Sequence, residues 1–126
     1  MDSLPDFEAK DGYAIFRPGG RASVQSFLSL LEGAVGACQS HGVRRLLVDA
    51  RKLDHPTLTT HQIFAFATGL ATFWDRSIRL VMLTRPDQID PEQFGRLVAG
   101  NRGLHFSSHL NEADALKDLL ARDAGE

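Results

Sequence analysis

Several features that define common protein classes are scarce or missing in this sequence. Its single cysteine, Cys38, excludes an internal disulfide framework and a cysteine-rich zinc site. Basic residues are not in excess, with 14 Lys and Arg against 16 Asp and Glu, and the net charge of -2 argues against a general nucleic-acid binder. No apolar run is long enough to span a bilayer, and the opening residues MDSLPD lack the basic and apolar regions of a signal peptide. We therefore expect a cytoplasmic protein without membrane insertion or a nucleic-acid partner.

Signature motifs of catalysis and cofactor binding are also missing. The sequence has no Gly-x-Ser-x-Gly, no Gly-x-Gly-x-x-Gly, no Walker-type loop and no His-Glu-x-x-His. Its five histidines have no acidic residue at metalloprotease spacing, so we expect no metal site. These absences predict no catalytic residues, no cofactor and no enzymatic activity. A hydrolase that acts through Asp49 and nearby residues is a third hypothesis, beside the regulatory domain and the ligand carrier considered below.

The composition that is present is typical of one globular domain. Apolar residues make up 43% of the 126 residues and charged residues 24%. A chain of this length buries one core, and we find no repeats, no low-complexity tract and no linker. We expect a single domain over residues 1–126, with its core at about 7–120.

Hydrophobic periodicity predicts alternating strands and helices. Two alternating runs flank Asp11-Gly12, which predicts a hairpin with a type I′ turn. The later elements expected, in chain order, are a helix from Ser23 to Gly42, a strand at 43–49, a helix capped by Thr59, a strand at 78–84, a helix opened by Asp90, a short strand at 104–107 and a helix capped by Asn111. Repeated strand–helix–strand units favour parallel pairing. The predicted fold is α/β, with a mixed sheet of four or five strands and about four helices.

Four segments in this order resemble STAS-type domains, the fold of bacterial anti-sigma-factor antagonists, and more closely the small stand-alone SpoIIAA-like proteins. They are LLVDAR (46–51), FAFA (64–67), RPDQIDP (85–91) and NRGL (101–104). The likeness runs from about Phe7 to Leu120. It implies a STAS-like fold and a regulatory or protein-interaction role rather than catalysis.

The resemblance also implies a phosphorylation switch that this sequence does not carry. Anti-sigma antagonists have an Asp-Ser-Ser or Asp-Ser-Thr motif at a helix start, where a partner kinase modifies the serine. Here the corresponding loop is DHPTLTT (54–60), which has no serine. We therefore expect that Thr57, Thr59 and Thr60 are not the main control point.

A candidate anion site follows the ends of two strands that we expect to be parallel neighbours. Asp49 and Arg51 follow one strand and Arg85 follows the other. Ligands bind beyond the carboxyl ends of such strands, and arginines bind phosphate or carboxylate groups through paired hydrogen bonds. The alternative is an ion pair between Asp49 and an arginine that fixes the loop.

Two threonines extend this candidate site. Thr59 and Thr60 lie at an expected helix N-terminus, where unpaired N–H groups and the helix dipole favour an anion. The alternative is that Thr59 is simply the N-cap.

The helix that follows Thr59 is apolar around most of its circumference. Phe64, Ala71 and Thr72 lie outside its main apolar stripe, so they are the candidate interface of a homodimer. The alternative is that another helix of the same chain covers this face.

Two functional hypotheses follow. The first is a non-enzymatic regulatory or protein-interaction domain whose protein partner the sequence does not identify. The second is a carrier or sensor of a small apolar or anionic ligand, bound at the strand ends beside the second helix.

Overall fold

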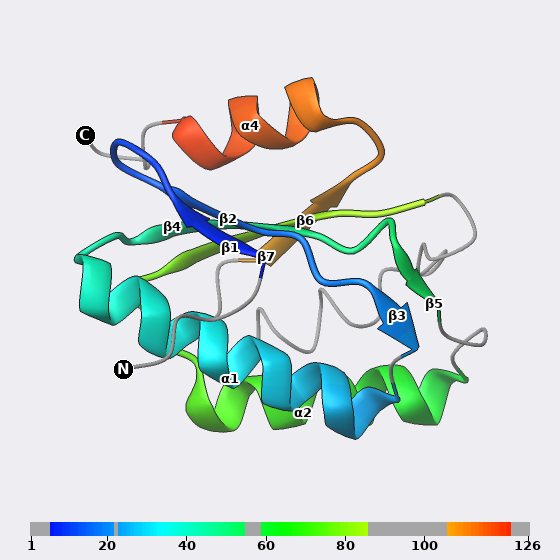
Figure 1. Cartoon of the computed structure of the whole chain (residues 1–126). Helices are drawn as coiled ribbons and strands as arrows, with labels where there is room; N and C mark the ends of the chain where they lie inside the picture. The colour runs from blue at the N-terminus through cyan, green and yellow to red at the C-terminus, as the bar shows by residue number, and fades with distance from the viewer. Residues whose placement is uncertain (1–5, 22, 55–58, 86–105, 122–126) are drawn as a thin grey trace.

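The protein is an α/β domain built on one five-stranded mixed sheet (Figure 1). The computed structural model describes residues 6–21, 23–54, 59–85 and 106–121. Its elements are β1 (Phe7–Ala9), β2 (Ala14–Phe16), β3 (Gly20–Arg21), α1 (Val24–His41), β4 (Arg45–Asp49), β5 (Leu53–Asp54), α2 (Thr60–Phe73), β6 (Arg79–Leu83), β7 (Phe106–His109) and α4 (Glu112–Leu120).

The main sheet has the strand order β1-β2-β4-β6-β7. β1 is antiparallel to β2, and each of the other neighbouring pairs is parallel. Helices α1 and α2 cover one face of the sheet and α4 covers the other (Figure 1). The predicted mixed sheet, with one hairpin followed by parallel strands, is therefore confirmed.

Two of the expected later elements fall partly or wholly outside the described residues. The described residues contain three helices rather than about four, because the helix expected to open at Asp90 lies outside them. The last strand is described over Phe106–His109 and continues two residues past the expected end at 107, while its expected start at 104 and 105 lies outside the described residues.

The hairpin is correct but its predicted turn type is wrong. A type I′ turn needs positive φ at both central residues. Gly12 has φ 85°, whereas Asp11 is not among the described residues with positive φ. One positive φ at the second central position is instead the pattern of a type II turn. Beside the turn, the Lys10 N–H donates to the Tyr13 carbonyl at 2.7 Å and joins the two strands.

The central strands are buried on both faces, as their continuous apolar runs predict. On β4, Leu46 and Val48 belong to the core under α1 and α2, whereas Leu47 belongs to the core under α4. On β6, Leu80 and Val81 divide in the same way. Each strand therefore joins two cores that its side chains enter alternately.

The helix ends carry the caps expected from the sequence. The Ser23 hydroxyl accepts the Ser26 N–H at 3.1 Å, and α1 ends at Gly42 with φ 70°, a left-handed C-cap. At α2, the Thr59 hydroxyl accepts the Gln62 N–H at 3.1 Å, and the Gln62 side chain accepts the Thr59 N–H at 2.9 Å. This reciprocal pair is a capping box, and it confirms Thr59 as the predicted N-cap of α2.

Helices α1 and α2 pack closely against each other. The rings of Phe27 and Phe66 stack with centroids 5.5 Å apart. A Cβ on Gly69 would lie 2.8 Å from Leu28 Cδ1, so the glycine allows the two helices to approach. Helix α1 therefore covers the side of α2 that carries Phe66 and Gly69, whereas Phe64 stays exposed.

A second, two-stranded sheet was not expected. β3 and β5 pair in parallel, with Gly20 opposite Leu53 and Arg21 opposite Asp54. Gly20 has φ 84°, a conformation in which glycine is favoured. This small sheet links the segment after β2 to the segment after β4.

The capping box at α2 gives a direct test of its structural role. Thr59→Ala is expected to lower the free energy of unfolding by about 1 kcal/mol, because the Gln62 N–H loses its acceptor. Urea unfolding followed by circular dichroism measures the change, and Thr59→Ser, which keeps the hydroxyl, is the matched control. An alanine variant as stable as the wild type would contradict this role.

Candidate functional site

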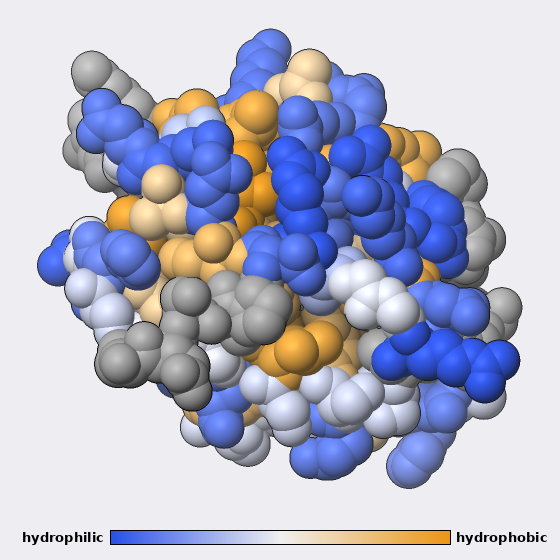
Figure 2. Space-filling view, viewed as in Figure 1, coloured by the Kyte–Doolittle hydropathy of each residue, from blue (hydrophilic) through white to orange (hydrophobic). Residues whose placement is uncertain are grey.

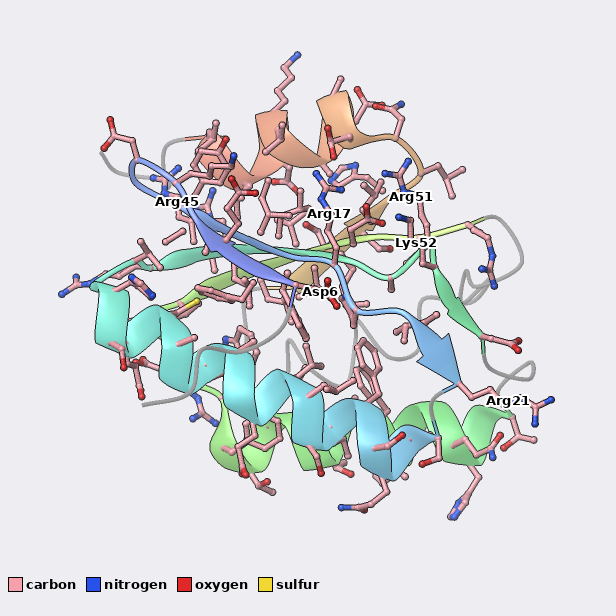
Figure 3. The ribbon with its side chains drawn as sticks, in the orientation of Figure 1. Asp6, Arg17, Arg21, Arg45, Arg51 and Lys52 are labelled. Atoms are coloured by element: carbon pink, nitrogen blue, oxygen red, sulfur yellow. The ribbon has the colours of Figure 1, made fainter. Side chains whose placement is uncertain are left out.

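Polar side chains gather where the parallel strands β2 and β4 end. In the register of the sheet, Phe16 lies opposite Val48, so Arg17 follows β2 beside Asp49 at the end of β4. Figure 3 shows Arg17, Arg51 and Lys52 at this same end of the sheet. In the space-filling view, hydrophilic side chains are concentrated on this part of the surface (Figure 2).

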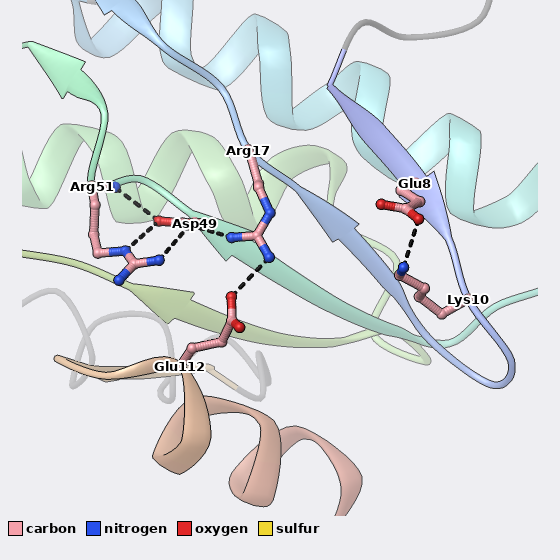
Figure 4. Close-up of polar contacts among 6 residues, drawn as sticks. All are labelled: Glu8, Lys10, Arg17, Asp49, Arg51 and Glu112. Atoms are coloured by element: carbon pink, nitrogen blue, oxygen red, sulfur yellow. Dashed lines mark hydrogen bonds and ion pairs between the residues drawn. The ribbon is translucent and has the colours of Figure 1, made fainter.

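The Asp49 carboxylate is the buried centre of this cluster. It is 5% exposed and accepts hydrogen bonds from two arginines (Figure 4). Arg51 binds side-on, with Nε 2.9 Å from Oδ1 and Nη2 2.9 Å from Oδ2. The Arg51 backbone N–H also donates to Oδ1 at 3.2 Å, and Arg17 Nη1 donates to Oδ2 at 2.5 Å. Both carboxylate oxygens therefore have charged donors.

These contacts keep Asp49 ionised. Burial alone would raise the pKa of Asp49, but the hydrogen bonds and charge of Arg51, with the hydrogen bond of Arg17, outweigh it. The pKa of the carboxyl group therefore lies below its ordinary value of 3.8. A carboxylate held in this way is a weak base, because protonation would break its hydrogen bonds with two guanidinium groups.

Further contacts tie three other segments to the cluster. Arg17 Nη2 donates to Glu112 Oε1 at 2.8 Å, which joins the start of α4 to the end of β2. The Arg17 backbone N–H donates to the Asp6 carbonyl at 3.0 Å. Arg85 Nη1 donates to the Arg51 carbonyl at 2.5 Å, which joins the segment after β6.

The structure brings together three of the residues predicted for the anion site. Asp49, Arg51 and Arg85 meet at the strand ends, and the predicted ion pair between Asp49 and an arginine is confirmed. Sequence reasoning missed Arg17 and Glu112. The signal for Arg17 was its position directly after the second hairpin strand, since parallel pairing with β4 sets that position beside Asp49. Glu112 gave no comparable signal.

The two candidate threonines lie at the start of α2. The hydrogen bonds of Thr59 run to Gln62, as the N-cap alternative predicts. Thr60 is the first residue of α2, and its side chain is not among the described ones.

The candidate interface residues of α2 have different surroundings. Phe64 is 41% exposed. Ala71 is half-buried and packs against the core beneath α1 and α2. Thr72 is exposed, and its hydroxyl donates to the Gly69 carbonyl at 2.6 Å.

A second polar cluster holds the other end of α4. Arg45 donates to the Leu119 carbonyl at 2.8 Å, and Arg79 donates to the Asp118 carbonyl at 3.1 Å. Both arginines begin strands, so they satisfy carbonyl groups of the last helical turn with charged donors.

Asp118 also contacts β7. Its Oδ2 accepts the Ser107 hydroxyl and lies 2.8 Å from His109 Nε2. Burial alone would raise the pKa of Asp118, but these hydrogen bonds hold it below its ordinary value.

The described residues contain no group of three or more His, Cys, Asp and Glu side chains arranged to hold a metal ion. Cys38 is buried, and this burial raises the pKa of its thiol to about 12, so it is a protonated core residue near neutral pH. In the same described part of the chain, no helix combines the length and apolarity needed to cross a membrane.

Comparison with known proteins identifies no family. No protein-family model matches the chain, and a search of curated proteins finds no match.

The Asp49 cluster predicts a specific pH dependence of stability. Asp49→Asn is expected to lower the free energy of unfolding near neutral pH by about 1–3 kcal/mol, because the amide cannot hold two guanidinium groups. Since the folded-state pKa lies below the ordinary 3.8, the stabilisation is complete above that value and is lost as the pH falls through the folded-state pKa. The difference between wild type and variant should therefore be constant down to about pH 5 and shrink below about pH 4.

Urea unfolding at several pH values measures this difference. Asp54→Asn is the matched control, because that carboxylate is exposed and lies 3.7 Å from Arg21. A variant as stable as the wild type at neutral pH, or a difference that grows in acid, would contradict the account.

Proposed function

We propose that the chain is a STAS-like regulatory domain that acts by binding protein, without catalytic turnover, through the exposed face of α2. The strand order, with an antiparallel hairpin leading into parallel strands, supports the STAS-like assignment. The four sequence segments that resemble SpoIIAA-like proteins support it as well. The proposal includes a cytoplasmic location, and the net charge of -2 favours a protein partner over nucleic acid.

The observation that carries the proposal is the exposure of Phe64. In the described residues, the large apolar side chains exposed to solvent are Phe64, Leu110 and Leu120. Phe64 differs from the other two because it lies inside α2, whereas Leu110 precedes α4 and Leu120 is the last residue of α4. Exposed aromatic side chains of this kind are enriched at protein interfaces.

The threonines beside Phe64 make this face less polar than its composition indicates. The Thr68 hydroxyl donates to the Phe64 carbonyl at 2.9 Å, and the Thr72 hydroxyl donates to the Gly69 carbonyl at 2.6 Å. These hydroxyl hydrogens are used within the helix, so a partner surface does not need to supply acceptors for them. With Ala65, which is also exposed, they leave room for a second backbone to approach.

The Asp49 cluster at the strand ends supports a binding role rather than catalytic turnover. Asp49, the residue on which the hydrolase hypothesis depends, is buried and engaged by two arginines. A general base needs an accessible lone pair and a pKa near the operating pH, whereas the lowered pKa of Asp49 makes it a poor proton acceptor.

A second copy of the chain is the simplest partner, and it makes the proposal testable with purified protein. Sedimentation equilibrium at tens of micromolar, on the order of a weak-interface dissociation constant, is expected to detect a dimer. Phe64→Glu should weaken the dimer at least about tenfold, because burying an unpaired carboxylate at an interface is costly. Leu120→Glu is the matched control, since Leu120 is 48% exposed on α4 across the sheet, and it should leave the dimer intact.

The possible results separate the parts of this proposal. A monomeric wild type would contradict self-association. A dimer that Phe64→Glu leaves intact, or that both variants weaken equally, would show that the α2 face is not the interface.

A further inference from the structure

The Glu112 carboxylate lies within reach of two arginines from different loops. It accepts a hydrogen bond from Arg17 Nη2 at 2.8 Å. The pKa of Arg51 is raised first by its hydrogen bond to Asp49 and also, through charge, by Glu112. One acidic side chain of α4 therefore interacts with both guanidinium groups.

Asp49 fixes these two guanidinium groups before any ligand arrives. Arg51 uses Nε and Nη2 on Asp49, and its Nη1 has no hydrogen bond within the part of the chain that the structure describes. Arg17 uses one terminal nitrogen on Asp49 and the other on Glu112. The side chain of Arg51 is 41% exposed and that of Arg17 is 38% exposed, so their outer N–H groups can meet a ligand from solvent.

We propose that Arg17 and Arg51 form a binding site for a phosphate dianion, free or as a phosphomonoester of a small molecule, and that the Glu112 carboxylate occupies this site until the anion displaces it.

Glu112 is an exchangeable occupant. Its side chain is 42% exposed and its ion pair with Arg17 is close to the surface. An exposed ion pair is weak enough for a dianion held by two guanidinium groups to outweigh it. After displacement, Arg17 and Arg51 stay anchored on the buried Asp49, which Glu112 does not contact in Figure 4.

The charge of the ligand follows from this competition. Glu112 is tethered, so it competes at a high effective concentration against any free monocarboxylate. A dianion can accept hydrogen bonds from both guanidinium groups at once, which a single carboxylate held by α4 does not do in the structure. Lys52 lies at the same end of the sheet and adds positive charge (Figure 3).

Phosphate binding at Arg17 and Arg51 is separate from the proposed protein-binding role and does not depend on the α2 face. A domain that fails to dimerise can still bind phosphate at Arg17 and Arg51, and the reverse also holds.

The test is a titration of the purified protein with inorganic phosphate, phenyl phosphate and acetate at about pH 8, where phosphate groups are mostly dianionic. Ionic strength is held constant with chloride. Binding is followed through the NMR signals of the arginine Nε–H groups. Phosphate is expected to shift the signals of Arg17 and Arg51, and acetate is expected to bind at least about tenfold more weakly because it carries one charge. Tighter binding of phenyl phosphate would identify a phosphomonoester as the ligand, and equal binding would identify free phosphate.

Two pairs of variants test the residues. Glu112→Gln should raise the affinity for phosphate about two- to five-fold, the range expected for removing an exposed ion pair. Asp114→Asn removes the same charge from the same helical turn without contacting Arg17 and should leave the affinity unchanged. Arg51→Gln should abolish the binding, whereas Arg44→Gln, an exposed arginine just before the other end of β4, should keep it.

Three results would overturn the proposal: acetate binding as tightly as phosphate, equal effects of Glu112→Gln and Asp114→Asn, or phosphate binding that survives Arg51→Gln. If Arg51→Gln does not fold, the comparison of Glu112→Gln with Asp114→Asn decides alone.

Discussion

The buried carboxylate of Asp49 determines how the loops at one edge of the sheet are arranged. A carboxylate that is 5% exposed must have charged or hydrogen-bonding partners, because an unpaired buried charge is strongly destabilising. Its partners come from the segments after β2 and β4, and through Arg17 the contact extends to the first residue of α4. One buried charge therefore sets the positions of three segments that are far apart in the sequence.

Helix α4 shows what this arrangement does for the fold. Its apolar side packs through Ala115 and Leu119 on a small core formed with Ile15, Leu47, Val81 and Leu83. Arginines hold both of its ends: Arg17 binds its first residue, and Arg45 and Arg79 bind its last carbonyl groups. Arg17 follows the end of β2, whereas Arg45 and Arg79 lie at the starts of β4 and β6. The donors therefore come from opposite ends of the strands and fix the position of α4 along them. A short helix with a small core gains orientation from such polar contacts.

Local signals in the sequence predicted most of the fold. The cap at Ser23 and the capping box of Thr59 with Gln62 depend on nearby residues, and the apolar runs of β4 and β6 indicate strands buried on both faces. Sequence reasoning missed the pairing of β3 with β5, because two-residue strands have no periodicity to detect. It also gave the turn at Asp11-Gly12 the wrong type, since the dipeptide is compatible with more than one positive-φ geometry.

The site was predicted in part for a related reason. Asp49, Arg51 and Arg85 follow strands whose parallel pairing could be expected, so their meeting at one edge was predictable. Arg17 could have been found from its position directly after the second hairpin strand, once the parallel pairing with β4 is known. Glu112 enters the cluster through the docking of α4, which no local pattern encodes.

The most direct test of the central role of the Asp49 cluster is native-state hydrogen exchange of wild type and Arg17→Gln. Arg17 connects Asp49 to Glu112, so its removal should reduce the protection of amides in α4 and in the segment from Arg51 to Leu53 together. Amides in the centres of β4 and β6 should keep their protection relative to global unfolding. Unchanged protection in α4, or a loss confined to Arg17 itself, would contradict the account.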